Sequence, residues 1–246
     1  MSRLVLGVQP VREVLRAHGA KSERVLVENG DSPQLAALLR MADFAGVKTE
    51  RVPRAFLEKL SGGVRHQGCA VYAPDLRLMS LDEVGNTPDL LIVALDEIQD
   101  PQNFGAIVRS CVALGEAAVL WPQNASAPLT PATFRASAGA IEHAKLVRVP
   151  SLRTALSELQ SRAARIVGLD GTAESVPLSS VDMSGPTVLI VGSEGKGLRK
   201  SVKTIATDIA AIPMSGVLDS LNASVATAIA LYEVARQRSN INILAT

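Results

Sequence analysis

Short apolar runs alternate with stretches in which apolar residues recur every three or four positions along the first 75 residues. The runs predict β-strands, and the spaced apolar residues predict amphipathic helices. The helix expected at 33–45 has clear boundary signals, since Ser32 can cap it, Pro33 suits its first position and Gly46 can end it. This alternation predicts a small α/β unit over residues 1–75.

The same alternation restarts after residue 89. Residues 76–89 show little periodicity and end in turn-forming residues, so we interpret them as a linker. The continuous apolar run at 89–98 is typical of a strand buried on both faces. Five more strands are predicted, with helical segments between most of them, at 117–122, 145–150, 164–170, 187–192 and 209–214. The fold class is therefore α/β, with a mainly parallel sheet in a domain over residues 90–240.

Composition excludes several classes of protein. Hydrophobic residues make up 47% of the chain, which is too many for a disordered protein. No apolar run reaches the roughly eighteen residues of a membrane span, and we recognise no signal peptide. Cys69 and Cys111 lie in apolar contexts, without a CxxC or Cys/His cluster. We therefore expect a cytoplasmic protein with no disulfide, no metal site and no membrane contact.

The net charge of +1 is uninformative as a total, but its distribution is not. Residues 1–75 hold 11 Lys and Arg against 8 Asp and Glu, a net charge of +3, and the remainder carries −2. A mildly basic first unit permits binding of nucleic acid without requiring it, because solvated protein surfaces commonly have this composition.

Ligands of parallel α/β sheets bind beyond the carboxyl ends of the strands. The loops to consider are therefore those that follow Leu95, Leu169, Val191 and Ile212. The first of them leads to Asn103 near a helix start and to Arg109 nearly two turns later. By themselves, these two residues are more typical of a helix cap and a solvated helix surface than of a site.

The loop after Val191 contains glycines at 192, 195 and 197, which allow a backbone to approach a ligand closely. Their spacing matches neither the dinucleotide-binding pattern nor the phosphate-binding P-loop. Glu194 stands among them, and its charge would repel a phosphate, so the loop favours a nucleoside or a cationic ligand. A nucleotide-hydrolysing enzyme is an alternative, but the Ser or Thr that would hold a metal after Lys196 is missing.

The last predicted helix begins with more capping residues than one helix needs. Ser220, Asn222 and Ser224 could each act as its N-cap, and one suffices. The surplus indicates that this segment has a role besides capping.

Three segments at these strand ends resemble the motifs of SPOUT-class RNA methyltransferases, in the TrmH-type branch that methylates the ribose 2′-hydroxyl. They are DPQNFGAIVRS (100–110), LIVGSEGKGLRK (189–200) and IPMSGVLDSLNASVATAIALYE (212–233). Residues 138–149 match a further family segment, and 7–15 and 65–71 resemble the family's N-terminal RNA-binding domain. The resemblance covers nearly the whole chain and is greatest to members that methylate a guanosine of large-subunit ribosomal RNA.

This resemblance implies a deep trefoil knot in the C-terminal part of the fold and S-adenosylmethionine as the cofactor, held largely by backbone groups. The positions expected to contact the cofactor are Leu169, Gly192, Gly195, Ile212, Met214 and Leu221. The positions expected to bind RNA in the first unit are Arg12, Arg16, Arg65 and His66. His66 is equally typical of a turn residue.

The resemblance also implies roles for five residues around the reacting ribose. Arg109 lies at the hydroxyl, either as a base assisted by the substrate or as a clamp on a phosphate. Asn103 and Asn222 orient Arg109 and the ribose, and Glu194 fixes the glycine loop and Arg109. Ser220 contacts the ribose or a phosphate and also caps the last helix. No metal is required, because the leaving group is neutral.

The expected function is thus S-adenosylmethionine-dependent 2′-O-methylation of ribosomal RNA. Methylation of transfer RNA, or of a ribosomal site that confers antibiotic resistance, stays open because the first unit reads RNA shape as much as sequence. A non-catalytic RNA-binding protein of the same fold is a further alternative, which failure to bind the cofactor would support.

The predicted helix at 223–237 has apolar residues on more than one side, whereas a surface helix needs only one apolar stripe. In relatives this helix packs across a two-fold axis. We therefore expect a homodimer whose interface includes the helix, with Ala230 and Val234 in the contact. The tail 241–246 either frays or extends that contact.

Overall fold

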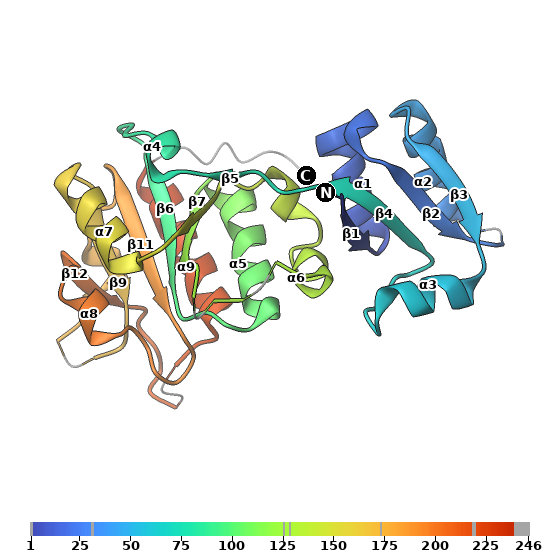
Figure 1. Cartoon of the computed structure of the whole chain (residues 1–246). Helices are drawn as coiled ribbons and strands as arrows, with labels where there is room; N and C mark the ends of the chain where they lie inside the picture. The colour runs from blue at the N-terminus through green and yellow to red at the C-terminus, as the bar shows by residue number, and fades with distance from the viewer. Residues whose placement is uncertain are drawn as a thin grey trace. The chain divides into compact units, whose positions relative to one another are not determined.

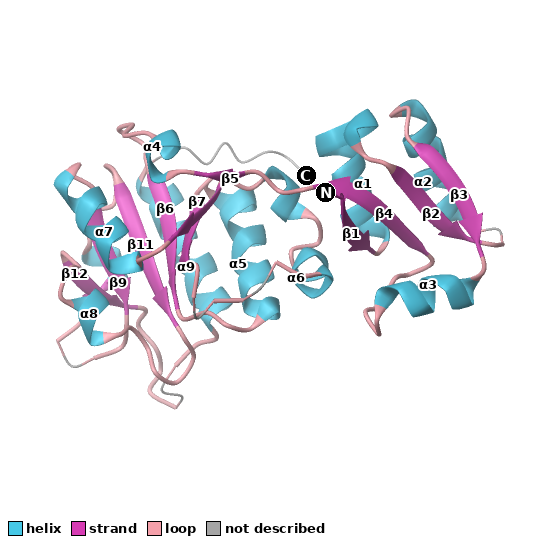
Figure 2. Cartoon of the chain, viewed as in Figure 1, coloured by secondary structure: helices cyan, strands magenta, loops and turns pink. Residues whose placement is uncertain are grey.

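The computed structural model describes residues 2–30, 32–124, 126–127, 129–172, 174–217 and 220–238, and the tail 241–246 lies outside them. The described residues form two compact units, each with its own β-sheet (Figures 1 and 2). The first unit is built from residues 2–77 and 129–143, and the second from the other described residues.

The first unit contains a four-stranded sheet in the order β1-β4-β2-β3. Its strands are β1 (Ser2–Leu6), β2 (Arg24–Glu28), β3 (Lys48–Val52) and β4 (Cys69–Pro74). β4 runs antiparallel to β1 and β2, and β3 runs parallel to β2. The helices between them are α1 (Val8–His18), the 3-10 turn η1 (Gly19–Lys21), α2 (Pro33–Phe44) and α3 (Arg54–Ser61). The predicted alternation of strands and helices is confirmed.

A segment from the middle of the chain completes this unit. α6 (Pro131–Ala136) packs on β1, and the 3-10 turn η2 (Ala140–His143) packs on α1. The fully buried Glu142 carboxylate accepts a hydrogen bond from Arg3 Nη1 at 2.9 Å and lies 2.9 Å from His18 Nε2. The order of elements along the chain therefore does not give the boundary of the unit, since this segment lies between two strands of the second sheet.

The second unit contains an eight-stranded sheet in the order β10-β12-β9-β11-β6-β7-β8-β5, in which every described pairing is parallel. The six predicted strands are confirmed as β6 (Leu91–Asp96), β7 (Ala118–Pro122), β8 (Leu146–Val149), β9 (Arg165–Leu169), β11 (Thr187–Gly192) and β12 (Asp208–Ala211). The edge strands are β5 (Leu78–Met79) and β10 (Val176–Pro177). The helical segments are α4 (Leu81–Val84), α5 (Pro101–Leu114), α7 (Leu152–Ser161), η3 (Leu178–Ser180), α8 (Lys200–Lys203) and α9 (Ala223–Gln237).

Part of the expected linker at 76–89 belongs to this second unit. β5 pairs with β8, and a capping box between Ser80 and Glu83 closes the single turn of α4. A two-residue strand and one helical turn are too short to show periodicity, which is why the sequence pattern did not reveal them.

Helices cover both faces of the eight-stranded sheet (Figure 1). α7 and α8 pack on one face, where alternate strand residues such as Ile92, Leu120 and Ile190 form a buried cluster. α5 and α9 pack against each other at the opposite face, where the rings of Phe104 and Trp121 meet edge to face at 5.3 Å. β6 is buried along its whole length, as its continuous apolar run predicts.

After its last strand the chain returns across the sheet. β12 lies beyond β9, on the side away from β11 and β6, yet the following helix α9 packs against α5 and β11. The trefoil knot expected from the family resemblance stays a prediction. Of the described helices, none has the length and apolarity that crossing a membrane requires.

Candidate active site

The carboxyl ends of four neighbouring strands meet at one edge of the second sheet. In register, Gly192 of β11 lies beside Asp96 of β6, and Leu169 of β9 lies between Val191 and Ala210. A cavity of about 520 Å³ opens there. This volume is within the range of roughly 300–1,000 Å³ that is typical of small-molecule sites. The loops after β9, β11 and β12 therefore converge, as the strand pattern predicts.

Every position expected to contact the cofactor lines this one cavity. These positions are Leu169, Gly192, Gly195, Ile212, Met214 and Leu221. Small residues such as Gly197, Ala211 and Ala226 line it as well, so backbone groups form much of its wall. Glu194 and Ser220 also contribute to the lining.

The glycine loop is tightly folded at its base. A Cβ atom on Gly192 would lie 2.3 Å from the carbonyl oxygen of Gly197, so only glycine fits there. Ser193 and Gly197 form an isolated antiparallel bridge, in which Gly197 N donates to Ser193 O at 3.0 Å. Gly195 and Gly197 have φ of +76° and +63°, a conformation that glycine adopts without strain.

Two carboxylates at the carboxyl ends of β6 and β9, the strands on either side of β11, hold the end of this loop. Asp96, which is fully buried, accepts hydrogen bonds from the backbone N of Arg199 (2.9 Å) and from its Nε (2.7 Å). The bond to Asp96 raises the pKa of the Arg199 guanidinium above its ordinary value. Asp170 accepts from Leu198 N at 3.3 Å and pairs with Lys203 Nζ at 2.5 Å.

Sequence reasoning missed these two aspartates. A signal was present, because a Leu-Asp dipeptide closes β6 at Leu95 and Asp96 and another spans the end of β9 at Leu169 and Asp170, at the sheet edge where ligands bind. Among the described residues, no cluster of His, Cys, Asp and Glu has the arrangement needed to hold a metal ion.

Three of the predicted catalytic residues form one hydrogen-bond network at the edge of the cavity. Asn103 Nδ2 donates to Glu194 Oε1 at 2.9 Å. Asn222 Nδ2 donates to Asn103 Oδ1 at 2.9 Å and also to Glu194 Oε1. The Asp100 carboxylate caps α5 by accepting from the backbone N of Asn103, which leaves the Asn103 side chain available for the network.

The excess of capping residues before α9 has a structural explanation. Asn222 is the N-cap, since its Oδ1 accepts from Ser224 N at 2.9 Å, while its Nδ2 serves the network with Asn103 and Glu194. One amide therefore both caps the helix and joins it to the site. The expectation that Ser220 caps this helix is wrong, because Ser220 lines the cavity two residues before the cap.

Arg109 lies apart from this network. It is exposed on α5, it is not among the residues that line the cavity, and no described residue forms a hydrogen bond or ion pair with it. Six residues turn an α-helix by about 600°, so Arg109 and Asn103 emerge on different sides of α5. The expected hydrogen bonds from Asn103 and Asn222 to Arg109 are not formed within the described chain, because these amides bond to each other and to Glu194.

Comparison with known proteins decides the family. A model of the SpoU rRNA Methylase family matches residues 90–232, and a model described as RNA 2′-O ribose methyltransferase substrate binding matches residues 4–78. The chain belongs to the SpoU rRNA methylase family. Its SpoU segment contains both the cavity and the network of Asn103, Glu194 and Asn222.

Relatives and solved structures agree with this SpoU assignment. A protein named uncharacterized tRNA/rRNA methyltransferase from Mycobacterium ulcerans (strain Agy99) is 41% identical over 245 residues, which cover 95% of this chain and 77% of the relative. The SpoU methyltransferase AviRb from Streptomyces viridochromogenes is 28% identical with a TM-score of 0.78, over 97% of this chain and 90% of that one. AviRb has also been solved in complex with the cofactor AdoMet. A structure named RNA 2′-O ribose methyltransferase has a TM-score of 0.79 and 29% identity, over 96% of this chain and 88% of that one.

In this SpoU chain, α9 has one buried and one exposed apolar face. Ala230 and Val234, expected in a dimer contact, are buried within the chain, so charges placed there would disrupt the chain's own core. The exposed face instead carries Val225, Ile229 and Tyr232, with exposed fractions of 46%, 38% and 54%. These residues line a shallow apolar surface together with Ser110, the neighbour of Arg109 on α5.

The four candidate RNA-binding residues of the first unit have different environments. Arg12 lines a cavity beside α2, and Arg65 is exposed. Arg16 pairs with Glu13 on the surface of α1. His66 is buried, and its Nδ1 accepts a hydrogen bond from Gly68 N at 3.1 Å, as expected of a turn residue; its contact with RNA stays a prediction.

The two cysteines are buried and unpaired. Burial raises the pKa of the Cys69 thiol to about 12 and raises that of Cys111 as well. Such thiols stay protonated at neutral pH, which suits core packing rather than a nucleophilic role.

Proposed function

We propose that this chain transfers the methyl group of S-adenosylmethionine to the ribose 2′-hydroxyl of a guanosine in large-subunit ribosomal RNA. Its family makes it an S-adenosylmethionine-dependent RNA 2′-O-ribose methyltransferase. One observation supports the assignment of the site above all others. A single cavity collects all six predicted cofactor positions, and the network of Asn103, Glu194 and Asn222 borders it.

The residues of the cavity suit this cofactor. Backbone groups at Gly192 and Ile212 offer donors and acceptors for a purine, and Leu169 and Leu221 offer apolar contacts for its rings. The Glu194 carboxylate favours a cationic ligand and would repel a phosphate. When bound, S-adenosylmethionine supplies a methyl group that is activated by a positively charged sulfur.

The chain itself must align the ribose and help its hydroxyl to lose a proton. The amides of Asn103 and Asn222 and the carboxylate of Glu194 provide donors and acceptors for ribose hydroxyls at the edge of the cavity. Arginine side chains stay charged at neutral pH. We therefore assign Arg109 to a phosphate of the RNA, and to proton removal only with the assistance of the substrate.

We also propose that the chain acts as a homodimer across the exposed apolar face of α9. Val225, Ile229 and Tyr232 supply the apolar area that a two-fold contact needs. Ser110 lines the same surface, so Arg109 lies at its border. A second copy packed there could receive Arg109 at its own cavity, which would account for the separation of Arg109 from the cavity of its own chain.

Two experiments test the dimer. Val225→Lys with Ile229→Lys should give monomers with little activity, while Val176→Lys, at an equally exposed apolar residue of β10, should not. Mixing inactive Arg109→Ala and Gly192→Val chains should then restore about a quarter of parental activity, because half of the dimers are mixed and each has one complete site. A fully active monomer would refute the dimer, and an inactive mixture would assign Arg109 to its own chain.

The RNA target is tested by mapping 2′-O-methyl groups in RNA from cells with and without the gene. Loss of one methyl group from large-subunit ribosomal RNA would support the proposal. Loss of a methyl group from transfer RNA would identify the alternative substrate instead. Purified chain that binds RNA but not S-adenosylmethionine would indicate a non-catalytic protein.

A further inference from the structure

The turn at residues 65–68, which resembles a family segment in sequence, holds Gln67 in an unusual conformation. Gln67 has a φ of +52°, which is uncommon for any residue with a side chain. The neighbours on both sides enforce this conformation: His66 is buried and accepts from Gly68 N at 3.1 Å, and Gly68 itself has a φ of +77°. Such local strain is frequent where a side chain must be presented to a ligand.

The Gln67 amide is fixed in one orientation. Its Oε1 accepts a hydrogen bond from Val8 N at 3.1 Å. Since a backbone N–H can only donate, the amide oxygen must face Val8, and the Nε2 group remains as a donor without a described partner.

The Gln9 amide is fixed in the opposite sense. Its Nε2 donates to Glu13 Oε1 at 2.8 Å. Because an ionised carboxylate only accepts, the Gln9 oxygen is left as an acceptor. The charge of Glu13 is balanced by Arg16 at 2.7 Å and is also met by His143 Nε2 at 3.0 Å.

Both amides line the same cavity in the first unit. It has a volume of about 490 Å³ and lies between α1, α2 and the turn at 65–68. Arg12 and Gln34 line it too, as do apolar side chains such as Val8 and Pro33. No described residue forms an ion pair with Arg12. The cavity therefore combines one fixed donor, one fixed acceptor, an adaptable amide, a cation and an apolar wall.

We propose that this cavity binds one unpaired nucleotide of the substrate RNA, an inference that rests on the proposed function. An unpaired base presents donors and acceptors on its edge, which Gln67 Nε2 and Gln9 Oε1 complement, while its faces are apolar. Arg12 suits the phosphate of the same nucleotide. The segment that carries these residues matches the substrate-binding model over residues 4–78.

The test compares three substitutions that each make the chain more negative by one charge. Gln67→Glu keeps an oxygen for Val8 N but removes the donor, and Arg12→Gln removes the cation. Lys48→Gln is the control. Lys48 lies in β3 beside Arg24 of β2, and this end of the sheet is opposite to the end where β4 begins at Cys69, just after the turn at 65–68. The probe is a transcript of large-subunit ribosomal RNA that the parental chain methylates. Gln67→Glu and Arg12→Gln should each bind it about tenfold more weakly than Lys48→Gln, with an unchanged KM for S-adenosylmethionine.

A second variant and a second RNA complete the test. Gln34→Ala removes an exposed side chain without a described hydrogen bond, so it should fold normally and still weaken binding about threefold. On a fully duplexed RNA of the same sequence, the difference in affinity between Gln67→Glu and Lys48→Gln should disappear. In the duplex every base is paired, so its edge is not available to Gln67.

Equal affinity of all variants for the ribosomal RNA transcript would overturn the nucleotide site while leaving the methyltransferase activity intact. A defect of equal size on the duplex would also overturn it, since the cavity would then read only the backbone. A parental chain that methylates no RNA would refute the proposed function itself, and the inference with it.

Discussion

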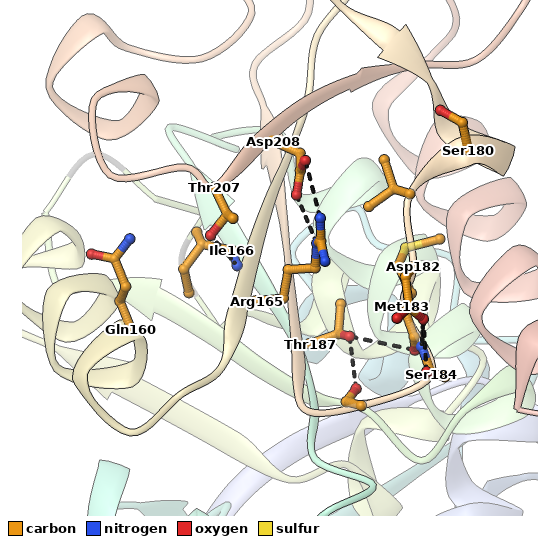
Figure 3. A network of polar contacts seen from close by, with 12 residues as sticks. Gln160, Arg165, Ile166, Ser180, Asp182, Met183, Ser184, Thr187, Thr207 and Asp208 are labelled. Carbon is orange, nitrogen blue, oxygen red and sulfur yellow. Dashed lines mark hydrogen bonds and ion pairs between the residues drawn. The ribbon is translucent and has the colours of Figure 1, made fainter.

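The two ends of the eight-stranded sheet carry similar polar side chains but use them differently. At the amino ends, Arg165 donates to Asp208 through Nε at 2.7 Å (Figure 3). Thr187 Oγ1 donates to the carbonyl oxygen of Gly185 at 2.8 Å. Arg238, which follows α9, donates to carbonyl oxygens of Asp89, Leu90, Met183 and Gly185. The hydrogen-bond donors at this end are therefore used to hold neighbouring strand ends and loops together.

At the carboxyl ends, the polar side chains bond to one another around a cavity. Glu194 of the glycine loop accepts hydrogen bonds from Asn103 of α5 and from Asn222, the N-cap of α9, so three separate segments are joined. Asp96 and Asp170 hold the end of the glycine loop. The loops are thereby positioned, while much of their backbone remains at the cavity wall. The comparison indicates that one end of the sheet stabilises the fold, while the other end suits the binding and reaction that we propose.

The largest effect should come from adding a single methyl group at the carboxyl end. Gly192→Ala places a Cβ 2.3 Å from Gly197 O and should abolish measurable binding of S-adenosylmethionine by calorimetry, as should the bulkier Gly192→Val. Gly185→Ala is the matched control at the amino end, where a Cβ meets nothing within 4 Å, and it should bind normally. Normal affinity of Gly192→Ala would place the cofactor elsewhere.

Arg238→Ala should destabilise the chain by about 3 kcal/mol, because several backbone carbonyls lose a charged donor. Partial burial lowers the pKa of Arg238, which is consistent with a guanidinium partly removed from water. Denaturant unfolding measures the loss, and the turnover per folded molecule should stay at the parental value. Parental stability would show that the amino end does not depend on this residue.

Asn103→Ala should lower turnover without lowering stability, the reverse of the result expected for Arg238→Ala. We expect turnover to fall about 100-fold, equivalent to about 2.7 kcal/mol in the barrier, with an unchanged melting temperature. Gln237→Ala is its control at the other end, since that amide accepts from Met183 N and donates to Val181 O, and its loss should lower melting but not turnover. Near-parental turnover of Asn103→Ala would remove the network from the mechanism.

Asp96→Asn should raise the KM for S-adenosylmethionine about tenfold, a change of about 1.4 kcal/mol, while turnover changes little. The reason is that Asp96 positions the glycine loop through Arg199 without lining the cavity. Steady-state kinetics separate the two constants, and Asp208→Asn at the amino end should alter neither. A fall in turnover at constant KM would contradict the positioning role.

Arg165→Ala should have the smallest effect. Its pair with Asp208 raises the pKa of Arg165, but the two side chains are 39% and 21% exposed, so solvent screens the interaction. We expect a loss of no more than about 1 kcal/mol in thermal or denaturant unfolding, decreasing further in high salt. A larger loss would mean that the amino-end network behaves as one cooperative unit.

The residue pattern by itself was sufficient to place six of the eight strands of the second sheet and the loops that form its site. A strand buried on both faces must be apolar throughout, so β6 and β11 stand out in the sequence. Parallel strands connected through helices bring their carboxyl ends to one edge, which is why the loops after Val191 and Ile212 could be placed there in advance. The assignment of Gly192, Ile212 and Leu221 to the cofactor came from the family resemblance, and all three line the cavity.

Other features depended on contacts between residues far apart in the chain. Packing, not periodicity, assigned 129–143 to the first unit, through the contacts of Glu142 with Arg3 and His18. The burial of Ala230 and Val234 likewise follows from the packing of α9 on α5, since helical periodicity does not say which of two apolar faces turns inward.

The roles of individual side chains at the site likewise depended partly on the sequence and partly on the tertiary structure. The sequence determined that Asn103, Glu194 and Asn222 occur at strand and helix ends, where side chains can reach a ligand. Only the tertiary structure decided that they bond to each other rather than to Arg109, and that Asp96 and Asp170 hold the loop. The physical reason is that residue type and local periodicity restrict which element a side chain belongs to, whereas its partner is selected by hydrogen-bond geometry between segments up to 119 residues apart.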